Sequence, residues 1–196
     1  MNATPRLVRA AILFSMVVSA TALSVVAQSA AVEGQVERQA VAQVASREWV
    51  AETLAEIVER IPPISEAARL RRRLAHATFC LPQNAIGILY YALNQLIGSV
   101  LCTQEMNEMT VVVTRFPFGA SLGRYIFVSV PLLSERTVRH EYGHTMQGYV
   151  HGPFYLLLEG VTSFVRATAA TLFPSLAKTY YERWPENEAN ELGGVR

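Results

Sequence analysis

The run His140-Glu141-Tyr142-Gly143-His144 places the strictest condition on how this chain folds. Its two histidines are four residues apart, and a helix sets both imidazoles one turn apart on the same face. Ser134 can cap such a helix, which we predict from Glu135 to about Gln147, with Gly148 as its stop. The rest of the fold must then bring other polar groups to this helix face.

Two imidazoles on one helix face can bind one divalent cation, at about 2.0–2.1 Å from each nitrogen for zinc. Glu141 directly follows His140, so its carboxylate is placed to reach a water on the ion rather than the ion itself. A bound ion lowers the pKa of that water to about 7, and the carboxylate takes its proton. The pattern therefore predicts zinc on His140 and His144, with Glu141 as general base. The plainer alternative is a partly buried histidine pair that is hydrogen-bonded to polar groups.

A catalytic zinc site needs a third protein ligand and one open position. The downstream candidates are Glu159, Glu182, Glu186, Glu188 and His151. We favour Glu186, because Ala189 leaves room for close helix packing and Asn190, one turn later, can hydrogen-bond a ligand histidine. Glu159 is second, since a carboxylate in an apolar run needs the metal, solvent or a partner such as Arg166.

A group that stabilises a developing oxyanion is also needed for hydrolysis. The candidates are Tyr149, His151, Tyr155, Tyr180 and Tyr181. Nothing in the sequence selects among them, and an aromatic cluster of this kind is more often part of a core. His151 lies beyond the predicted helix end, so its direction is undefined.

The N-terminus resembles a targeting segment. Arg6 and Arg9 precede a charge-free run from Ala10 to Ala30, which ends in small residues. This is the pattern of a secretory signal peptide, and the run is also near the roughly 20 residues that cross a bilayer. We expect residues 1–30 to be a cleaved signal or an uncleaved anchor, with an ordinary core helix as a third alternative. Both leading alternatives make the protein exported, secreted or anchored to the membrane.

Residues 31–79 are predicted to be a helical N-terminal segment. One helix is expected from Val32 to Arg60, where prolines stop it, and a second from Ser65 to about Thr78. The second carries the basic cluster Arg69, Arg71, Arg72 and Arg73. The cluster fits a solvated face, a contact with anionic lipid head groups, or a site where a pro-region is removed.

Residues 80–196 contain the remaining elements. We predict a chain break at Leu81–Asn84, followed by the apolar segment Ala85–Leu101 as a buried or membrane-lying helix. Thr110–Thr114 and Arg124–Val130 are β-branched and aromatic, and glycines lie between them, so we predict a small antiparallel ribbon that precedes the histidine helix. Further on, an apolar helix is expected from Gly152 to about Phe173, and a short last helix from Trp184 to Gly193.

Cysteine usage and charge bound the function classes. Cys80 and Cys102 are the only cysteines. A bridge between them would close a loop of about 20 residues and contribute on the order of 3 kcal/mol; the alternative is two buried free thiols. The formal charge is +1 and no nucleic-acid-binding signature is present, so nucleic acid is excluded as a partner.

Four motifs in a fixed order carry a family resemblance. They are Ser121–Val128, His140–Gln147, Gly152–Leu156 and Glu186–Val195. Together they resemble an uncharacterised bacterial group of HExxH zinc metallopeptidases that are membrane-associated or exported. The ending is similar to the Glu-x-x-Ala-Asp of the HtpX-type and CAAX prenyl peptidases, in which two histidines and that glutamate hold zinc. Residues 32–79 have no counterpart in the resemblance.

The resemblance implies a gluzincin-like centre with zinc on His140, His144 and Glu186, and with Glu141 as base. Position 190 is Asn where the better-studied relatives have Asp, which makes the hydrogen bond to the ligand neutral and weaker. The multi-span membrane framework of those relatives is absent, so their substrate class is not carried over.

The sequence thus predicts an α+β, mainly α-helical, zincin-like single domain. The expected function is that of a zinc-dependent metallopeptidase acting on a peptide or protein substrate. The alternatives are a non-enzymatic envelope scaffold with a structural or vestigial metal site, and a zinc hydrolase of another amide or ester.

Overall fold

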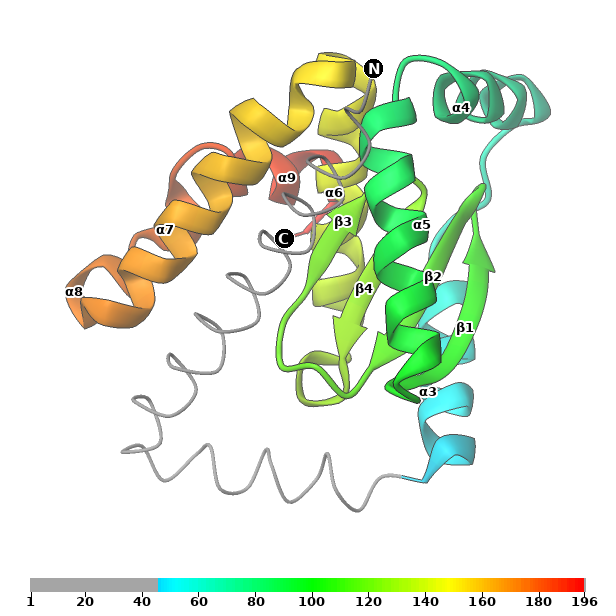
Figure 1. Ribbon diagram of the computed structural model, residues 1–196, viewed down its shortest axis with the longest axis horizontal. Helices are drawn as coiled ribbons and strands as arrows, with labels where there is room; N and C mark the ends of the chain where they lie inside the picture. Colours follow the sequence, from blue (N-terminus) through cyan, green and yellow to red (C-terminus); the bar gives the residue numbers. More distant parts are fainter. Residues whose placement is uncertain (1–45, 196) are drawn as a thin grey trace, which may run out of the picture.

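The structure is a computed structural model that describes residues 46–195, so the predicted signal or anchor segment lies outside the described residues. A small sheet forms the middle layer. Helix α5 (Leu81–Leu96) crosses one face of the sheet, and helices α3 (Arg47–Glu59) and α6 (Glu135–His151) pack against the other (Figure 1). The fold is α+β and mainly helical, as predicted.

The sheet has four strands in the order β1-β2-β4-β3. They are β1 (Val100–Met106), β2 (Met109–Thr114), β3 (Ala120–Leu122) and β4 (Tyr125–Ser129). Strands β1 and β2 form a hairpin whose two turn residues, Asn107 and Glu108, have φ of 53° and 70°. A two-residue turn with positive φ at both positions has a backbone twist that fits the right-handed twist of the flanking strands. Arg73 secures the less suited of the two, Glu108, by hydrogen bonds of 2.7 and 2.9 Å.

The predicted antiparallel ribbon is wrong, because β2 and β4 are parallel neighbours. The antiparallel partners are β1 for β2 and β3 for β4. After β2 the chain forms β3 at the edge of the sheet and leaves a gap one strand wide. It then turns at Gly123 (φ 64°), and β4 fills the gap between β2 and β3. The sequence did not indicate β1 and β3, since neither has a strong alternating pattern.

Both faces of the sheet are buried, as the unbroken apolar run Val111-Val112-Val113 indicates. Successive side chains point to opposite faces. Val111 and Val113 join one core with Val50 and Leu54 of α3, whereas Val112 joins a second core beneath α5. Each of the three valines is fully buried.

The N-terminal helices begin at serine caps. The Ser46 hydroxyl accepts from the Trp49 amide, and α3 begins at Arg47 after this cap. Of the helix predicted from Val32 to Arg60, the part before Ser46 lies outside the described residues. Helix α4 (Glu66–Ala77) begins after its cap Ser65, as predicted.

The segment predicted as a break at Leu81–Asn84 is instead the first turn of α5. Pro82 is tolerated there because the first amides of a helix have no partner within the helix. The predicted apolar helix begins earlier than expected and ends at Leu96, since Val100 and Leu101 belong to β1. Cys80 and Cys102 are free thiols, and Cys80 Sγ lies 3.4 Å from the Gly148 carbonyl oxygen. The disulfide bridge is therefore not formed.

After Ser134, which caps α6 as predicted, the helix continues past Gly148 to His151, and Gly152 (φ 52°) is its C-cap. The chain then forms η3 (Gly152–Phe154), the π-helical η4 (Leu156–Gly160), α7 (Val161–Leu172), α8 (Pro174–Ala177), η5 (Tyr180–Glu182) and α9 (Glu186–Gly193). Within residues 46–195, no helix combines the length and apolar character that crossing a membrane requires.

Helix α9 packs closely along α6, and glycines make this possible. A Cβ at Gly143 would lie 1.8 Å from the Ala189 carbonyl oxygen. A Cβ at Gly193 would lie 1.9 Å from the Arg139 carbonyl oxygen. The two backbones can therefore approach only because both positions lack a side chain, and this contact sets the relative position of α6 and α9.

Candidate metal centre

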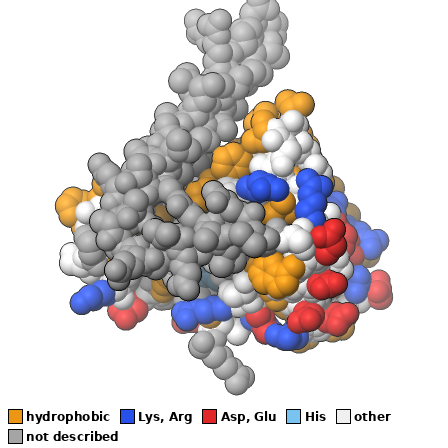
Figure 2. Space-filling model, turned by 90° about the horizontal axis from the view of Figure 1, so that it is seen from below, with side chains coloured by type: hydrophobic (Ala, Val, Ile, Leu, Met, Phe, Trp, Pro, Cys, Tyr) orange, Lys and Arg blue, Asp and Glu red, His pale blue; other side chains and the backbone are white. Residues whose placement is uncertain are grey.

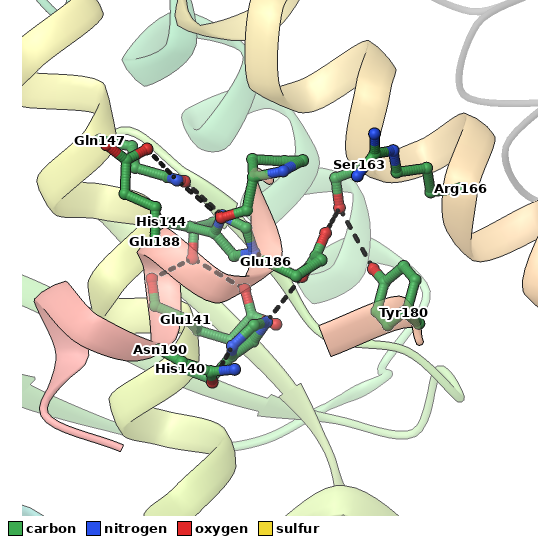
Figure 3. Close-up of polar contacts among 12 residues, drawn as sticks. His140, Glu141, His144, Gln147, Ser163, Arg166, Tyr180, Glu186, Glu188 and Asn190 are labelled. Atoms are coloured by element: carbon green, nitrogen blue, oxygen red, sulfur yellow. Dashed lines mark hydrogen bonds and ion pairs between the residues drawn. The ribbon is translucent and has the colours of Figure 1, made fainter. Parts of the chain in front are cut away.

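Three predicted ligands converge between α6 and α9 (Figure 3). His140 Nε2 and His144 Nε2 lie 3.0 and 3.3 Å from the same oxygen, Oε2, of Glu186. All three side chains are buried, and their ligand atoms lie within 4.8 Å of one another. Donor atoms around a tetrahedral zinc ion lie about 3.3 Å apart. The cluster therefore fits a metal ion in its donor types and in its spacing.

The other nitrogen of each imidazole is hydrogen-bonded to an amide side chain. His140 Nδ1 lies 2.9 Å from Asn190 Oδ1, the contact that the sequence predicted. His144 Nδ1 lies 2.7 Å from Gln147 Oε1. Such bonds direct Nε2 and its lone pair toward a cation.

Gln147 was missed as part of the site, although it fixes a proton position. Its Nε2 donates to the Pro185 carbonyl oxygen and to Glu188 Oε2, each at 2.8 Å. Both amide hydrogens are used on groups that only accept, so Oε1 must be the atom that faces His144. His144 Nδ1 then carries the proton. The available signal was spacing, since Gln147 follows His144 by three residues on one helix.

Glu186 lies in the first turn of α9 and is fully buried. Its second oxygen accepts a hydrogen bond of 2.5 Å from Ser163 Oγ, which lies 3.4 Å from the Tyr180 hydroxyl. Burial alone would raise the pKa of Glu186, but hydrogen bonds from His140, His144 and Ser163 hold it well below its usual range. The carboxylate is therefore charged.

Glu186 favours the positively charged form of the His144 imidazole. Burial alone would lower the pKa of His144. The hydrogen bond to Glu186 and the negative charges of Glu141 and Glu186 instead raise it to about 9. The same arrangement favours a cation.

The Glu141 carboxylate is positioned by the edge strand β3. Ser121 Oγ donates to Glu141 Oε2 at 2.9 Å and lies 2.6 Å from the Glu141 backbone oxygen. A Cβ at Gly119 would lie 2.5 Å from Glu141 Oε1, so this glycine leaves space for the carboxylate. Neither neighbour was predicted to serve the site, because both contacts depend on the sheet order.

The other candidate ligands lie elsewhere in the network. Glu159 is fully buried and forms an ion pair with His151; burial raises the pKa of Glu159, which the charge of His151 opposes. Arg166 does not pair with Glu159, since its guanidinium donates to the Trp184 carbonyl oxygen. Glu188 accepts from Gln147 and from Trp184 Nε1. Glu182 is exposed.

The candidate groups for oxyanion stabilisation differ in their contacts and in their exposure. The Tyr149 hydroxyl lies 2.7 Å from His76 Nε2, and Tyr155 is buried with its hydroxyl 3.4 Å from the Ser121 carbonyl oxygen. Tyr181 packs its ring edge-on against the His140 ring at 5.4 Å and is 52% exposed. Among the four candidate tyrosines, it alone joins contact with a ligand histidine to broad solvent exposure.

The fold and site define an α+β protein with a buried His-His-Glu cluster that can hold a metal ion. No family model, curated protein or solved structure matches this chain.

Proposed function

We propose that this protein is a zinc-dependent metallopeptidase of zincin-like fold. His140, His144 and Glu186 would hold the ion, and Glu141 would act as general base. The observation that carries the proposal is that both Nε2 atoms approach one oxygen of Glu186, while the Nδ1 atoms are hydrogen-bonded to Asn190 and Gln147. The ordered motifs that resemble exported HExxH peptidases support the same assignment.

Two imidazoles and one carboxylate are a donor set that suits zinc, with a fourth position left for water or substrate. When bound, zinc supplies a water of lowered pKa and polarises a carbonyl oxygen. Other divalent ions share these ligands, so the proposal names zinc on the donor set and on the resemblance.

The roles of the protein groups follow from their contacts. Glu141 would take a proton from the attacking water and return it to the leaving amine. Ser121 holds one of its oxygens at 2.9 Å and so limits the rotation of the carboxylate. Tyr181, beside His140, is the favoured donor to the developing oxyanion.

A peptide substrate is favoured by the position of β3. This strand lies at the edge of the sheet and carries Ser121, the neighbour of Glu141. An extended peptide can add to such an edge through main-chain hydrogen bonds, which would bring its carbonyl groups past the base. The exported location stays a prediction from residues 1–30.

The test is the variant Glu141→Gln. It should abolish hydrolysis of a casein digest while the protein keeps one equivalent of zinc, because glutamine cannot take the proton but does not disturb the ligands. Glu191→Gln, an exposed position on α9, is the matched control and should retain full activity. Undiminished hydrolysis by Glu141→Gln would overturn the mechanism, and hydrolysis of small amides without casein would change the substrate class.

A non-enzymatic scaffold is the second candidate, because α5 and α7 expose many large apolar side chains. Elemental analysis separates the two functions. One equivalent of zinc together with hydrolysis supports the peptidase. Protein that purifies without metal and gains no thermal stability from added zinc supports the scaffold.

A further inference from the structure

Helix α5 is amphipathic in the inverted sense. Its buried side consists of Gln83 (1% exposed), Asn84, Gly87 and Asn94. Its outer side, including the C-cap, consists of apolar residues apart from Gln95. The large ones are Leu81, Ile86, Ile88, Leu89, Leu93, Leu96 and Ile97, with Leu96 83% exposed. A helix in water normally turns its apolar side to the core.

Specific hydrogen bonds hold the polar side chains of α5 on its inner side. Gln83 Nε2 donates to the Gly152 carbonyl oxygen, and Asn84 Oδ1 accepts from the Arg124 backbone amide. Asn94 accepts from the Ser99 hydroxyl and thereby secures the loop that leads into β1. Turning the helix to bury its apolar side would break all these contacts, so the apolar side faces outward by construction.

The exposed side of α5 has almost no groups that could hydrogen-bond to a protein partner. Gln95 is its only exposed residue with a polar side chain, and its Nε2 already donates to the Tyr91 hydroxyl at 2.6 Å. Protein interfaces use about one hydrogen bond per 100–200 Å². Acyl chains require none. In the sequence, no Asp, Glu, Lys or Arg occurs from residue 74 to residue 104.

The apolar surface continues beyond the N-terminal end of α5. Phe79 and Phe154 are exposed there, and Phe79 lies against Gly152. Helix α4 packs against the same end and exposes Arg71 and Arg73 of the arginine cluster, although Arg73 also pairs with Glu108. Arg72 is turned inward and donates to the Asn107 carbonyl oxygen and the Tyr142 hydroxyl. Figure 2, seen from below, shows hydrophobic side chains that stand out toward the upper right, while acidic side chains lie along the right and lower sides of the molecule.

The remaining chain also points to a bilayer. The charge-free run from residue 10 to residue 30 is separated from Ser46 by 15 residues, which reach at most about 50 Å when fully extended. An anchor in that run would keep α5 within reach of the membrane. Basic residues beside an apolar surface are complementary to anionic lipid head groups.

We infer that the outer side of α5, together with Phe79 and Phe154, lies in the interfacial region of an anionic lipid bilayer, with the helix axis parallel to the membrane. With 16 residues, α5 is about 24 Å long, too short to cross the hydrocarbon core. The ligand helix α6 packs on the opposite face of the sheet, so the metal centre lies on the side away from the lipid (Figure 1). This inference does not depend on the proposed function.

The test places a fluorescent probe at single positions of the full chain. In a background with Cys80→Ala and Cys102→Ser, one protein carries Leu96→Cys on α5, and its matched control carries Glu56→Cys on α3, also exposed. Both are labelled with an environment-sensitive dye and mixed with phosphatidylcholine vesicles that contain phosphatidylglycerol and a nitroxide-labelled lipid. The dye at position 96 should shift to the blue and be quenched severalfold more than the dye at position 56. Vesicles without phosphatidylglycerol should give a smaller effect.

Three outcomes would overturn the inference. Equal, weak quenching at both positions would mean that any vesicle binding comes from another segment, such as residues 10–30. A blue-shifted dye at position 96 without vesicles, independent of protein concentration, would mean that the chain itself covers α5. A shift that grows with concentration would mean that a second copy does. Circular dichroism confirms that both labelled proteins are folded.

Discussion

At the scale of single residues, the site depends as much on the groups behind the ligands as on the ligands. Gln147 is fully buried and uses its oxygen and its nitrogen in three hydrogen bonds. It therefore fixes the tautomer of His144 and links that ring to the start of α9. Ser121 has a comparable relation to Glu141.

Replacing Gln147 with Leu should weaken zinc binding by about tenfold to a hundredfold, because His144 loses the acceptor that holds its Nδ1 proton. Competition with a chelator of known affinity measures the change. Gln104→Leu, at an exposed position on β1, is the control and should bind zinc as the wild type does. An unchanged zinc affinity in a folded Gln147→Leu protein would show that the hydrogen bond does not matter.

The sequence predicted the candidate ligands better than the side chains that hold them in place. His140, His144 and Glu186 were predictable because helical spacing and a local motif identify them. Asn190 followed from its position one turn after Glu186. Ser121 was not predictable, because its contact with Glu141 exists only once the β3 edge lies beside α6.

At the scale of elements, local signals located helix ends, while pairing between distant segments was not visible. Ser134 caps the helix that it was predicted to cap, and Ser65 lies at the predicted start of α4 and caps it. The parallel pairing of β2 with β4 was missed, since it depends on where β4 enters the sheet. For α5 the sequence left a buried and a membrane-lying helix open, and it could not show that the polar side faces the core, because Gln83 and Asn84 bond to partners distant in sequence.

Replacing Gly143 with Ala should disrupt the contact between α6 and α9. The added Cβ would lie 1.8 Å from a backbone oxygen, so the helices must separate. We expect a loss of about 1–3 kcal/mol in unfolding free energy, together with a loss of zinc. Gly160→Ala is the control: its nearest neighbour lies at 3.7 Å, and alanine favours helix, so stability should hold or rise. Denaturant unfolding and zinc content measure both, and full zinc retention in Gly143→Ala would contradict the packing argument.

At the scale of the whole molecule, stability should depend on pH through His76. This residue is buried, and its ring meets the Tyr149 hydroxyl at the junction of α4 and α6. Burial lowers the pKa of His76 from 6.5 to about 4, and the charges of Arg124 and Arg72 act in the same direction. Between these values the unfolded chain binds more protons than the folded one. The contribution of His76 is therefore complete above about pH 6.5 and is lost as the pH falls toward 4.

His76→Gln keeps an acceptor for Tyr149 and removes the titration. Between neutral pH and about pH 5, the wild type should lose about 2 kcal/mol more unfolding free energy than this variant. Urea unfolding at both pH values measures the difference, and carboxylates that titrate in both proteins cancel. Parallel losses in the two proteins would mean that His76 does not carry the effect.

Because the candidate ligands come from two different helices, a bound cation would hold these helices together and stabilise the fold. An ion that binds only the folded chain contributes about 2.7 kcal/mol at a hundredfold excess over its dissociation constant. Here this free energy would stabilise the contact between α6 and α9, because the imidazoles come from α6 and the carboxylate from α9. Chelation would thus loosen the carboxyl-terminal third first, while the sheet, which contributes no ligand, would keep its structure.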